Sequence, residues 1–140
     1  MNAGEGVLGV DPGRRKAGFA LLDACGDVVV SGIEPIERLP ESLRRLVRER
    51  DVTAIALGRG TNVREVKAAL EGLGLPIHLV DEYETSRGAR NLYFVDHPPR
   101  GWRRLLPIGL QVPPRPIDDY AAILIARRFL ARGAAARSPS

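Results

Sequence analysis

The chain has 140 residues, a length typical of a single globular domain. Lys and Arg outnumber Asp and Glu by 21 to 17, and the net charge of +4 suits a phosphate-rich partner. The single cysteine, Cys25, excludes an internal disulfide and a Cys-rich zinc site. No basic segment followed by a long apolar run opens the sequence, so we expect a cytoplasmic protein without a signal peptide or a membrane partner.

Three short strands are predicted before any helix. Residues 7–10 form an apolar run that stops at Asp11, where Pro12 and Gly13 favour a turn. Residues 17–23 and 28–33 are predicted as the next two strands, which gives an antiparallel meander. The first strand therefore delivers Asp11 at its end.

The middle of the chain alternates helices and strands. Apolar residues at helical spacing predict a helix over residues 39–50, and a buried strand over 53–58 follows it. Asn62 is predicted to cap a second helix that ends near Gly72. A fifth strand over residues 76–80 then ends at Asp81 and Glu82. Helices that connect strands in this way imply parallel pairing.

The C-terminal third contains two more predicted helices. Residues 86–95 form the first, and a proline-rich irregular segment separates it from the last helix, predicted over residues 117–132. Ala122, Ile125 and Phe129 follow Asp118 at helical spacing, so this acid heads the apolar stripe that packs on the sheet.

The small, polar and basic residues 133–140 are predicted to be a flexible C-terminal tail, which leaves residues 1–132 as the folded domain. The element order of this domain is β-β-β-α-β-α-β-α. It predicts an α/β fold with a five-stranded mixed sheet flanked by helices.

Acidic residues stand at the ends of three predicted elements that lie far apart in the sequence. They are Asp11, the pair Asp81 and Glu82, and the pair Asp118 and Asp119. Mg²⁺ and Mn²⁺ prefer oxygen ligands, and two such ions about 3.5–4 Å apart catalyse phosphodiester hydrolysis. Converging acids would suit a metal-dependent nuclease. Taken singly, Asp11 also fits an Asx-turn and Asp118 a helix N-cap, and the spacing alone leaves both interpretations open.

Three stretches of the sequence together resemble a known family. They are VLGVDPGRRKAGFALLD, VDEYETSRGAR and PRGWRRLLPIGLQVPPRPIDDYAAILIARRFL. In this order they closely resemble the YqgF-type pre-16S rRNA processing nucleases, relatives of the RuvC Holliday-junction resolvases. The resemblance covers residues 7–132 and implies the ribonuclease H-like fold.

The same resemblance implies roles for the acids. Asp11, Glu82 and Asp118 match the catalytic ligands that hold Mg²⁺ or Mn²⁺, and Asp119 would help to hold a metal or supply a nearby charge. Asp81 would point the opposite way from Glu82 if strand alternation persists.

The loop after the fourth strand departs from the family. YqgF-type nucleases usually carry a Gly-Leu-Pro segment and a longer loop there, whereas this chain has Leu57-Gly58-Arg59-Gly60-Thr61-Asn62. The substrate is therefore open at this point. The loop lacks the Gly-Lys-Ser/Thr ending of a Walker loop, and it fits either a phosphate contact through Arg59 and Thr61 or a plain turn and cap.

Basic residues lie close to the acids in the sequence and suit a polyanion. An aromatic residue among arginines further suits base stacking, although Trp102 could equally fold over the core. The candidate nucleic-acid-binding residues are Arg14, Arg15, Lys16, Arg59, Arg87, Arg100, Trp102, Arg103 and Arg104, with Arg90 beside them.

The sequence thus predicts a metal-dependent nuclease that hydrolyses phosphodiester bonds in structured nucleic acid. The resemblance favours RNA of the pre-16S rRNA type. Branched DNA is the alternative, and a Holliday-junction resolvase would have to be a homodimer. Two further hypotheses are a non-catalytic nucleic-acid-binding module of the same fold and a phosphotransferase related to the actin-like ATPases, suggested by the turn at Asp11.

Overall fold

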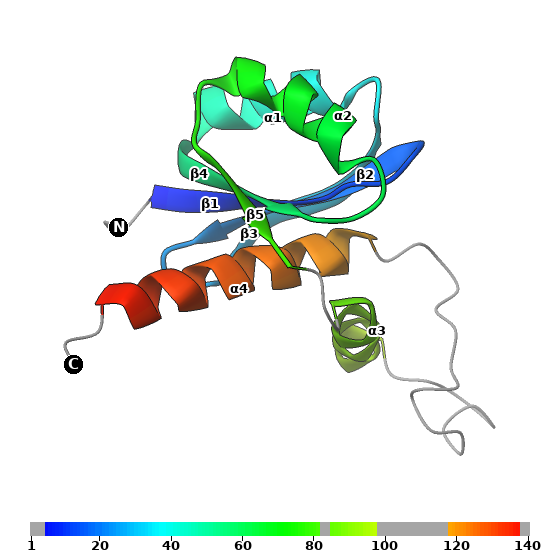
Figure 1. Cartoon of the computed structure of the whole chain (residues 1–140). Helices are drawn as coiled ribbons and strands as arrows, with labels where there is room; N and C mark the ends of the chain where they lie inside the picture. The colour runs from blue at the N-terminus through cyan, green and yellow to red at the C-terminus, as the bar shows by residue number, and fades with distance from the viewer. Residues whose placement is uncertain (1–4, 82–84, 98–117, 138–140) are drawn as a thin grey trace.

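A five-stranded mixed sheet forms the centre of the molecule (Figure 1). The computed structural model describes residues 5–81, 85–97 and 118–137. The described elements, in chain order, are β1 (Glu5–Asp11), β2 (Lys16–Asp23), β3 (Val28–Pro35), α1 (Leu39–Glu49), β4 (Asp51–Gly58), α2 (Val63–Leu70), the 3₁₀ turn η1 (Glu71–Leu73), β5 (Ile77–Val80), α3 (Thr85–Asp96) and α4 (Asp118–Arg137). The predicted α/β class with a five-stranded mixed sheet is confirmed, and two helices, α3 and α4, follow the fifth strand.

The strand order is β3-β2-β1-β4-β5. The first three strands form the predicted antiparallel meander, while β1 pairs with β4 and β4 with β5 in parallel. The parallel strands therefore end at one edge of the sheet. β4 lies between β1 and β5, which places these two strands about 10 Å apart at a spacing of about 4.8 Å per strand.

Helices cover both faces of the sheet (Figure 1). On one face, α1 and α2 bury Leu39, Leu43, Val66 and Leu70 against the strands. On the other face, α4 packs along the sheet with α3 beside it. Successive residues of a strand point to opposite faces of the sheet. Every second residue of a strand therefore packs against α1 and α2, and the residues between them pack against α4.

Two glycines allow α4 to approach the backbone of the sheet closely. A Cβ atom at Gly9 of β1 would overlap the carbonyl oxygen of Ala122, and one at Gly18 of β2 would overlap the carbonyl of Asp118. Because no side chain separates these surfaces, the helix is held directly against β1 and β2. This contact fixes where the first turn of α4 lies.

The apolar stripe predicted for the last helix is confirmed. Ala122 and Ile125 are fully buried, and Phe129 is partly buried against the same core. The predicted end of this helix near Arg132 is wrong, because α4 continues to Arg137, so residues 133–137 of the predicted tail are helical. The run of alanines over residues 134–136 has the highest helix propensity and favours this extension. None of the described helices is long and apolar enough to cross a membrane.

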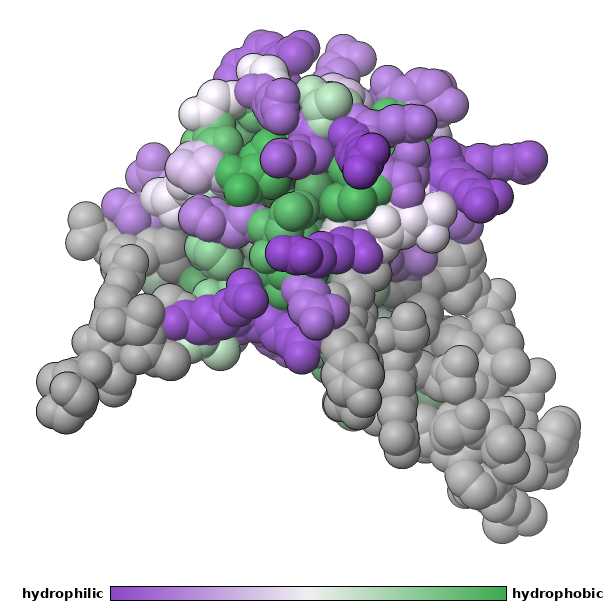
Figure 2. Space-filling view, viewed as in Figure 1, coloured by the Kyte–Doolittle hydropathy of each residue, from purple (hydrophilic) through white to green (hydrophobic). Residues whose placement is uncertain are grey.

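The edge of the sheet formed by β5 leaves part of the core near the surface. On the face shown in Figure 2, hydrophobic side chains gather in the middle and hydrophilic side chains surround them. Leu75, Ile77 and Leu79 are only partly buried there. β5 is thus an edge strand with partly exposed apolar side chains, and hydrophilic side chains surround the apolar ones on this face.

Candidate metal centre and nucleic-acid interface

Asp11 is the last residue of β1 and lies on the face that α4 covers. Val7 belongs to the core beneath α4, and Gly9 contacts Ala122 of that helix. Strand alternation places Asp11 on the same face as these two residues. The carboxylate is half-buried at the edge where the parallel strands end.

Asp118 and Asp119 begin α4 directly beside this point. Gly18 pairs with Asp11 across the β1–β2 ladder, and the backbone of both helix acids packs on Gly18. The first and the last of the three predicted acidic points, 107 residues apart by subtraction of their numbers, are therefore brought together. Acids in the first turn also match the positive end of the helix dipole.

The surroundings of Asp118 and Asp119 disfavour ionised carboxylates when no cation is bound. Burial raises the pKa of the half-buried Asp118 carboxyl, the nearby Lys16 ammonium lowers it, and the Asp119 carboxylate raises it. Asp119 itself is only 9% exposed. A divalent cation would favour the charged form of these acids, because it adds positive charge where burial and like charge oppose ionisation. Carboxylate oxygens are the type of ligand that Mg²⁺ and Mn²⁺ prefer.

The middle acid predicted for the centre, Glu82, lies outside the described residues. Its neighbour Asp81 is exposed, and its backbone carbonyl accepts a hydrogen bond from Arg128. Within the residues that are described, no three His, Cys, Asp or Glu side chains form a group that could hold a metal. Asp11, Asp118 and Asp119 are among the described residues, so these three acids do not form a metal-holding group by themselves, and the predicted centre also requires Glu82.

The loop after β4 is tied to the loop after β1. Asn62 occupies the N-cap position of α2, but its side chain makes no capping hydrogen bond. Its amide Nδ2 instead donates to the carbonyl of Gly13 over 3.1 Å. The predicted N-cap position of Asn62 is confirmed, but its side chain does not cap the helix, because the left-handed backbone (φ 67°, ψ 22°) differs from the extended conformation in which an N-cap side chain reaches the helix amides.

Exposed basic residues line the same edge of the sheet. Arg14, Arg15 and Lys16 follow Asp11 in the β1–β2 turn and all three are exposed. Arg59 follows β4, is exposed, and donates its backbone N–H to the carbonyl of Val80 over 3.1 Å. Topology therefore brings these four predicted residues to the end of the sheet that carries Asp11.

The remaining predicted nucleic-acid-binding residues cannot be placed in the same way. Arg100, Trp102, Arg103 and Arg104 lie outside the described residues, and of Arg87 only the position on α3 is described.

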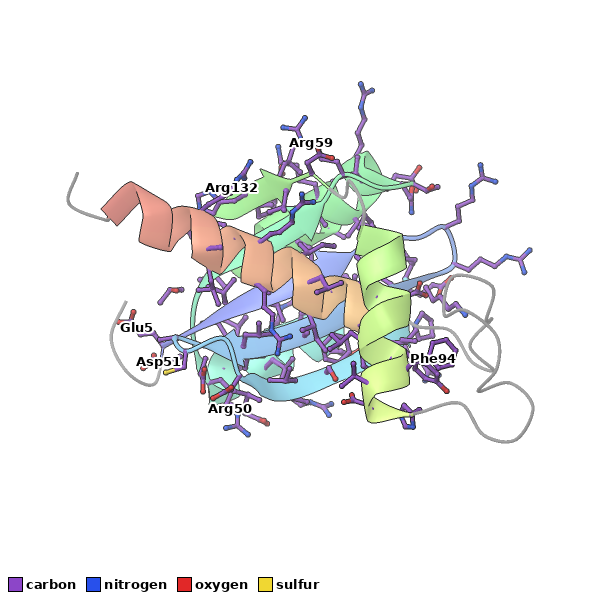
Figure 3. All side chains as sticks on the ribbon, turned by 90° about the horizontal axis from the view of Figure 1, so that it is seen from below. Glu5, Arg50, Asp51, Arg59, Phe94 and Arg132 are labelled. Carbon is purple, nitrogen blue, oxygen red and sulfur yellow. The ribbon has the colours of Figure 1, made fainter. Side chains whose placement is uncertain are left out.

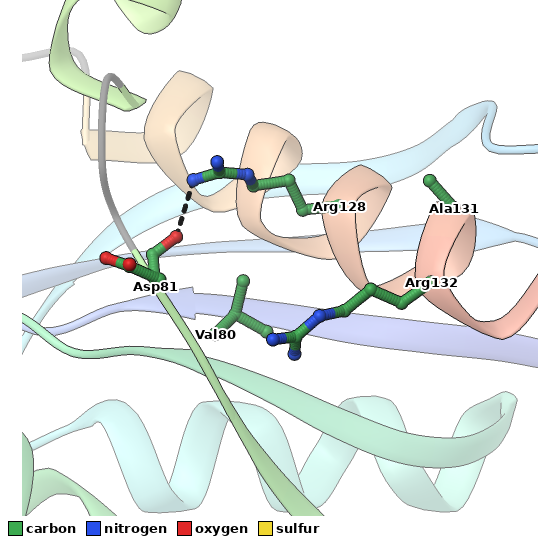
Figure 4. A pocket seen from close by; sticks show the side chains of 5 residues that line it. All are labelled: Val80, Asp81, Arg128, Ala131 and Arg132. Atoms are coloured by element: carbon green, nitrogen blue, oxygen red, sulfur yellow. Dashed lines mark hydrogen bonds between the residues drawn. The ribbon is translucent and has the colours of Figure 1, made fainter. Parts of the chain in front are cut away.

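A pocket between β5 and α4 contains basic residues that the sequence analysis missed. It has a volume of about 530 Å³ and is lined by Val80, Asp81, Arg128, Ala131 and Arg132 (Figure 4). Arg128 Nη1 donates to the Asp81 carbonyl oxygen over 2.6 Å. The spacing of the two arginines was an available signal, because residues four apart share one face of a helix.

A buried tyrosine joins α3 to the first turn of α4. Tyr120 is 7% exposed, and its hydroxyl donates to Asp96 Oδ2 over 2.9 Å. Tyr93 of α3 meets the Tyr120 ring edge to face, with centroids 5.6 Å apart. No local pattern in the sequence indicates this contact, because the two residues lie on separate helices.

Comparison with known proteins relates the chain to solved structures. No protein-family model matches the chain, and no curated protein matches it in sequence. A ROK family transcriptional regulator, a homolog of the E. coli MLC protein, gives a TM-score of 0.45 at 16% identity. That match covers 64% of this chain and only 31% of the regulator, so this chain spans about a third of its length.

Thermus thermophilus RuvC gives a TM-score of 0.55 at 17% identity, covering 91% of this chain and 96% of RuvC. The same protein in complex with a Holliday junction substrate gives 0.58 at 17% identity, covering 92% and 96%. The likeness thus spans nearly the whole of both chains. The chain has an α/β fold with a mixed five-stranded sheet like that of RuvC.

Proposed function

We propose that the chain is a Mg²⁺- or Mn²⁺-dependent nuclease of the ribonuclease H-like fold. Asp11, Glu82 and Asp118 are its catalytic metal ligands, and Asp119 contributes a further ligand or a nearby charge. The observation that carries this proposal is the meeting of Asp11 with the first turn of α4 over Gly18. The likeness of fold to RuvC, a protein solved with a Holliday junction, supports the same conclusion.

The protein's own groups have distinct tasks in this reaction. Asp11, Glu82 and Asp118 would hold the ions, and bound ions would supply activation of a water and neutralisation of charge at the scissile phosphate. Lys16, whose charge acts on Asp118, would contact an oxygen of the scissile phosphate. Arg14 and Arg15 are exposed beside it and hold the adjoining backbone phosphates.

The direct test replaces Asp11 with Asn. Cleavage of end-labelled structured RNA and of a four-way DNA junction is measured in Mn²⁺ under single-turnover conditions. We expect a loss of at least about 100-fold, the scale of removing one group that stabilises transition-state charge. Asp51→Asn is the matched control, since Asp51 is an exposed acid at the start of β4, remote from the proposed centre. An unchanged rate in folded Asp11→Asn protein would overturn the assignment.

Structured RNA is the substrate that we propose, with pre-16S rRNA as the type. Branched DNA is the second candidate, favoured by the likeness to RuvC in its Holliday junction complex. A resolvase must cut two strands symmetrically, so it needs two sites in a dimer. Sedimentation equilibrium decides this point, because a stable monomer that cleaves RNA would exclude the resolvase alternative.

The same assays separate an enzyme from a binding module. A module that only binds would hold RNA or junction DNA equally well with and without chelator and would cut neither in any metal. A nuclease of the proposed type cuts in Mn²⁺ and stops cutting when the metal is removed. Cleavage that persists in excess chelator would contradict the metal dependence.

A further inference from the structure

Segments that carry exposed basic residues are joined by hydrogen bonds into a line that leads away from the candidate metal centre. Asn62 binds the loop after β4 to Gly13 in the loop after β1, and Arg59 binds the end of β4 to Val80. Val80 in turn lines the pocket of Arg128 and Arg132. The loop after β1, the loop after β4 and the seam between β5 and α4 each carry arginines, and they are therefore linked side by side.

The pocket at the far end of this line has the chemistry of a phosphate site. Arg128 and Arg132 come from consecutive turns of α4, are both exposed and line the same hollow (Figure 4). Asp81 contributes its carbonyl to Arg128, and in Figure 4 its carboxylate points away from Arg132. Guanidinium groups match the oxygens of a phosphate in charge and in geometry. Figure 3 shows Arg132 and Arg59 on the same side of the molecule.

An exposed ring stands beside the pocket. His78 lies two residues before Val80 on β5, is exposed, and packs on Phe129 with ring centroids 4.8 Å apart and planes tilted by 33°. Phe129 lies between Arg128 and Arg132 in the sequence of α4. Alternation of basic groups with an accessible ring is the pattern that binds unpaired nucleotides, because every base can stack while the phosphates are held.

We infer that the seam between β5 and α4 binds a single-stranded segment of the substrate. One backbone phosphate enters the Arg128–Arg132 pocket, and an unpaired base stacks on His78. Arg128 and Arg132 lie 10 and 14 residues after Asp118 on α4, so at a rise of about 1.5 Å per residue the pocket is about 15–21 Å along the helix from its first residue. The inference rests on the proposed function, since it assigns the substrate's flank to a site outside the metal centre.

The test measures binding rather than cleavage. Fluorescence anisotropy follows a labelled 12-nucleotide oligouridylate and a 12-base-pair RNA duplex in Ca²⁺ buffer at several salt concentrations. Arg132→Ala should weaken single-strand binding about fivefold to tenfold, the scale of one charge-assisted contact. The slope of log K against log salt should fall by about 0.7, the value for one phosphate in a single strand.

The second variant and the control separate stacking from charge. His78→Ala should weaken binding of the single strand several-fold and leave duplex binding within about twofold, because only an unpaired base offers its face. Arg44→Ala removes an equally exposed arginine from α1 on the opposite face of the sheet and should change neither. Arg128 is left intact because it also holds the Asp81 carbonyl.

Two results would overturn the inference, and they are distinguishable. If the wild-type protein binds but Arg132→Ala and His78→Ala behave like Arg44→Ala, the subsite is wrong while the proposed nuclease stands. If the wild-type protein binds neither RNA, both the subsite and the proposed function fail. Circular dichroism of each variant establishes that the fold is retained.

Discussion

The surroundings of Asp118 disfavour the charged form of its carboxyl group. It is half-buried, and burial together with the neighbouring Asp119 raises the pKa of its carboxyl above the ordinary value of 3.8, although Lys16 partly offsets this. A buried carboxylate near another one destabilises the folded state wherever it is ionised. Destabilisation by a charged carboxylate is typical of functional sites, where the reaction requires that carboxylate to be ionised.

The first prediction is that Asp118→Asn stabilises the protein at pH 7. Between pH 3.8 and the raised pKa, the folded state binds more protons than the unfolded state, so wild-type stability rises as the pH falls through this window. The amide lacks this dependence. We expect Asp118→Asn to have a Tm higher by on the order of a few degrees at pH 7, and its advantage to shrink towards pH 4.

Thermal denaturation of both proteins at pH 7 and pH 4 checks this prediction, with Asp51→Asn as the control for losing an exposed acid. A variant that is less stable than wild type at pH 7, or an advantage that does not change with pH, would show that burial of Asp118 carries no cost.

Individual residues also mark the limit of what the sequence could predict. Asp11 was placed correctly because Pro12 and Gly13 end its strand locally. The Asn62 side chain was assigned wrongly because its partner, Gly13, lies 49 residues away. Glu82 remains a prediction. Local sequence patterns thus located the acids at the ends of helices and strands. They could not predict hydrogen-bond partners that are distant in the sequence.

At the scale of elements, the contact of α4 with β1 and β2 positions the candidate centre. The helix lies on glycine backbone at Gly9 and Gly18, so its first turn sits beside Asp11 without an intervening side chain. The apolar stripe of α4 predicted that this helix packs on the sheet. It did not predict how closely, because the glycines that permit the approach are on other elements.

The second prediction follows from this contact. Gly9→Ala should destabilise the protein by roughly 2–3 kcal/mol, since its Cβ would meet the Ala122 carbonyl oxygen and backbone must shift to admit it. Because the shift moves α4, cleavage should fall together with stability. Urea denaturation and single-turnover cleavage measure the two effects.

Gly72→Ala is the matched control for the effect of adding a methyl group. A Cβ at Gly72 meets nothing within 4 Å, so this variant should be as stable as wild type or more stable by about 0.4–1 kcal/mol. Equal stabilities for the two variants would mean that the close approach of α4 at Gly9 is not required.

Other elements were predicted with similar success for a shared reason. The meander, both crossover helices and β5 follow from hydrophobic periodicity and turn residues, which are local signals. The end of α4 at Arg137 was missed because alanines carry no periodicity while favouring the helix. The pocket beside Arg132 was missed because it exists only where β5 meets α4.

At the scale of the whole molecule, acid and basic groups share one edge of the sheet. Asp11 and the start of α4 lie where the parallel strands end, and Arg14, Arg15 and Arg59 surround them. Positive charge around a buried acidic corner attracts a polyanion, while the corner itself repels phosphate until cations are present. In the proposed nuclease, metal binding should therefore precede or accompany productive substrate binding.

The third prediction concerns the folded domain as a whole. Ions that bind only the folded state stabilise it by RT ln(1 + [L]/Kd), which is about 2.7 kcal/mol at 100 times Kd. Mn²⁺ should accordingly raise the Tm of the wild-type protein and of Asp51→Asn, and raise that of Asp11→Asn and Asp118→Asn much less. Scanning calorimetry over a Mn²⁺ series, with equal ionic strength kept by NaCl, measures this without any substrate. Equal shifts in all four proteins would locate the metal elsewhere, whereas selective shifts without cleavage of any RNA or DNA would retain the metal centre and leave the protein a binding module.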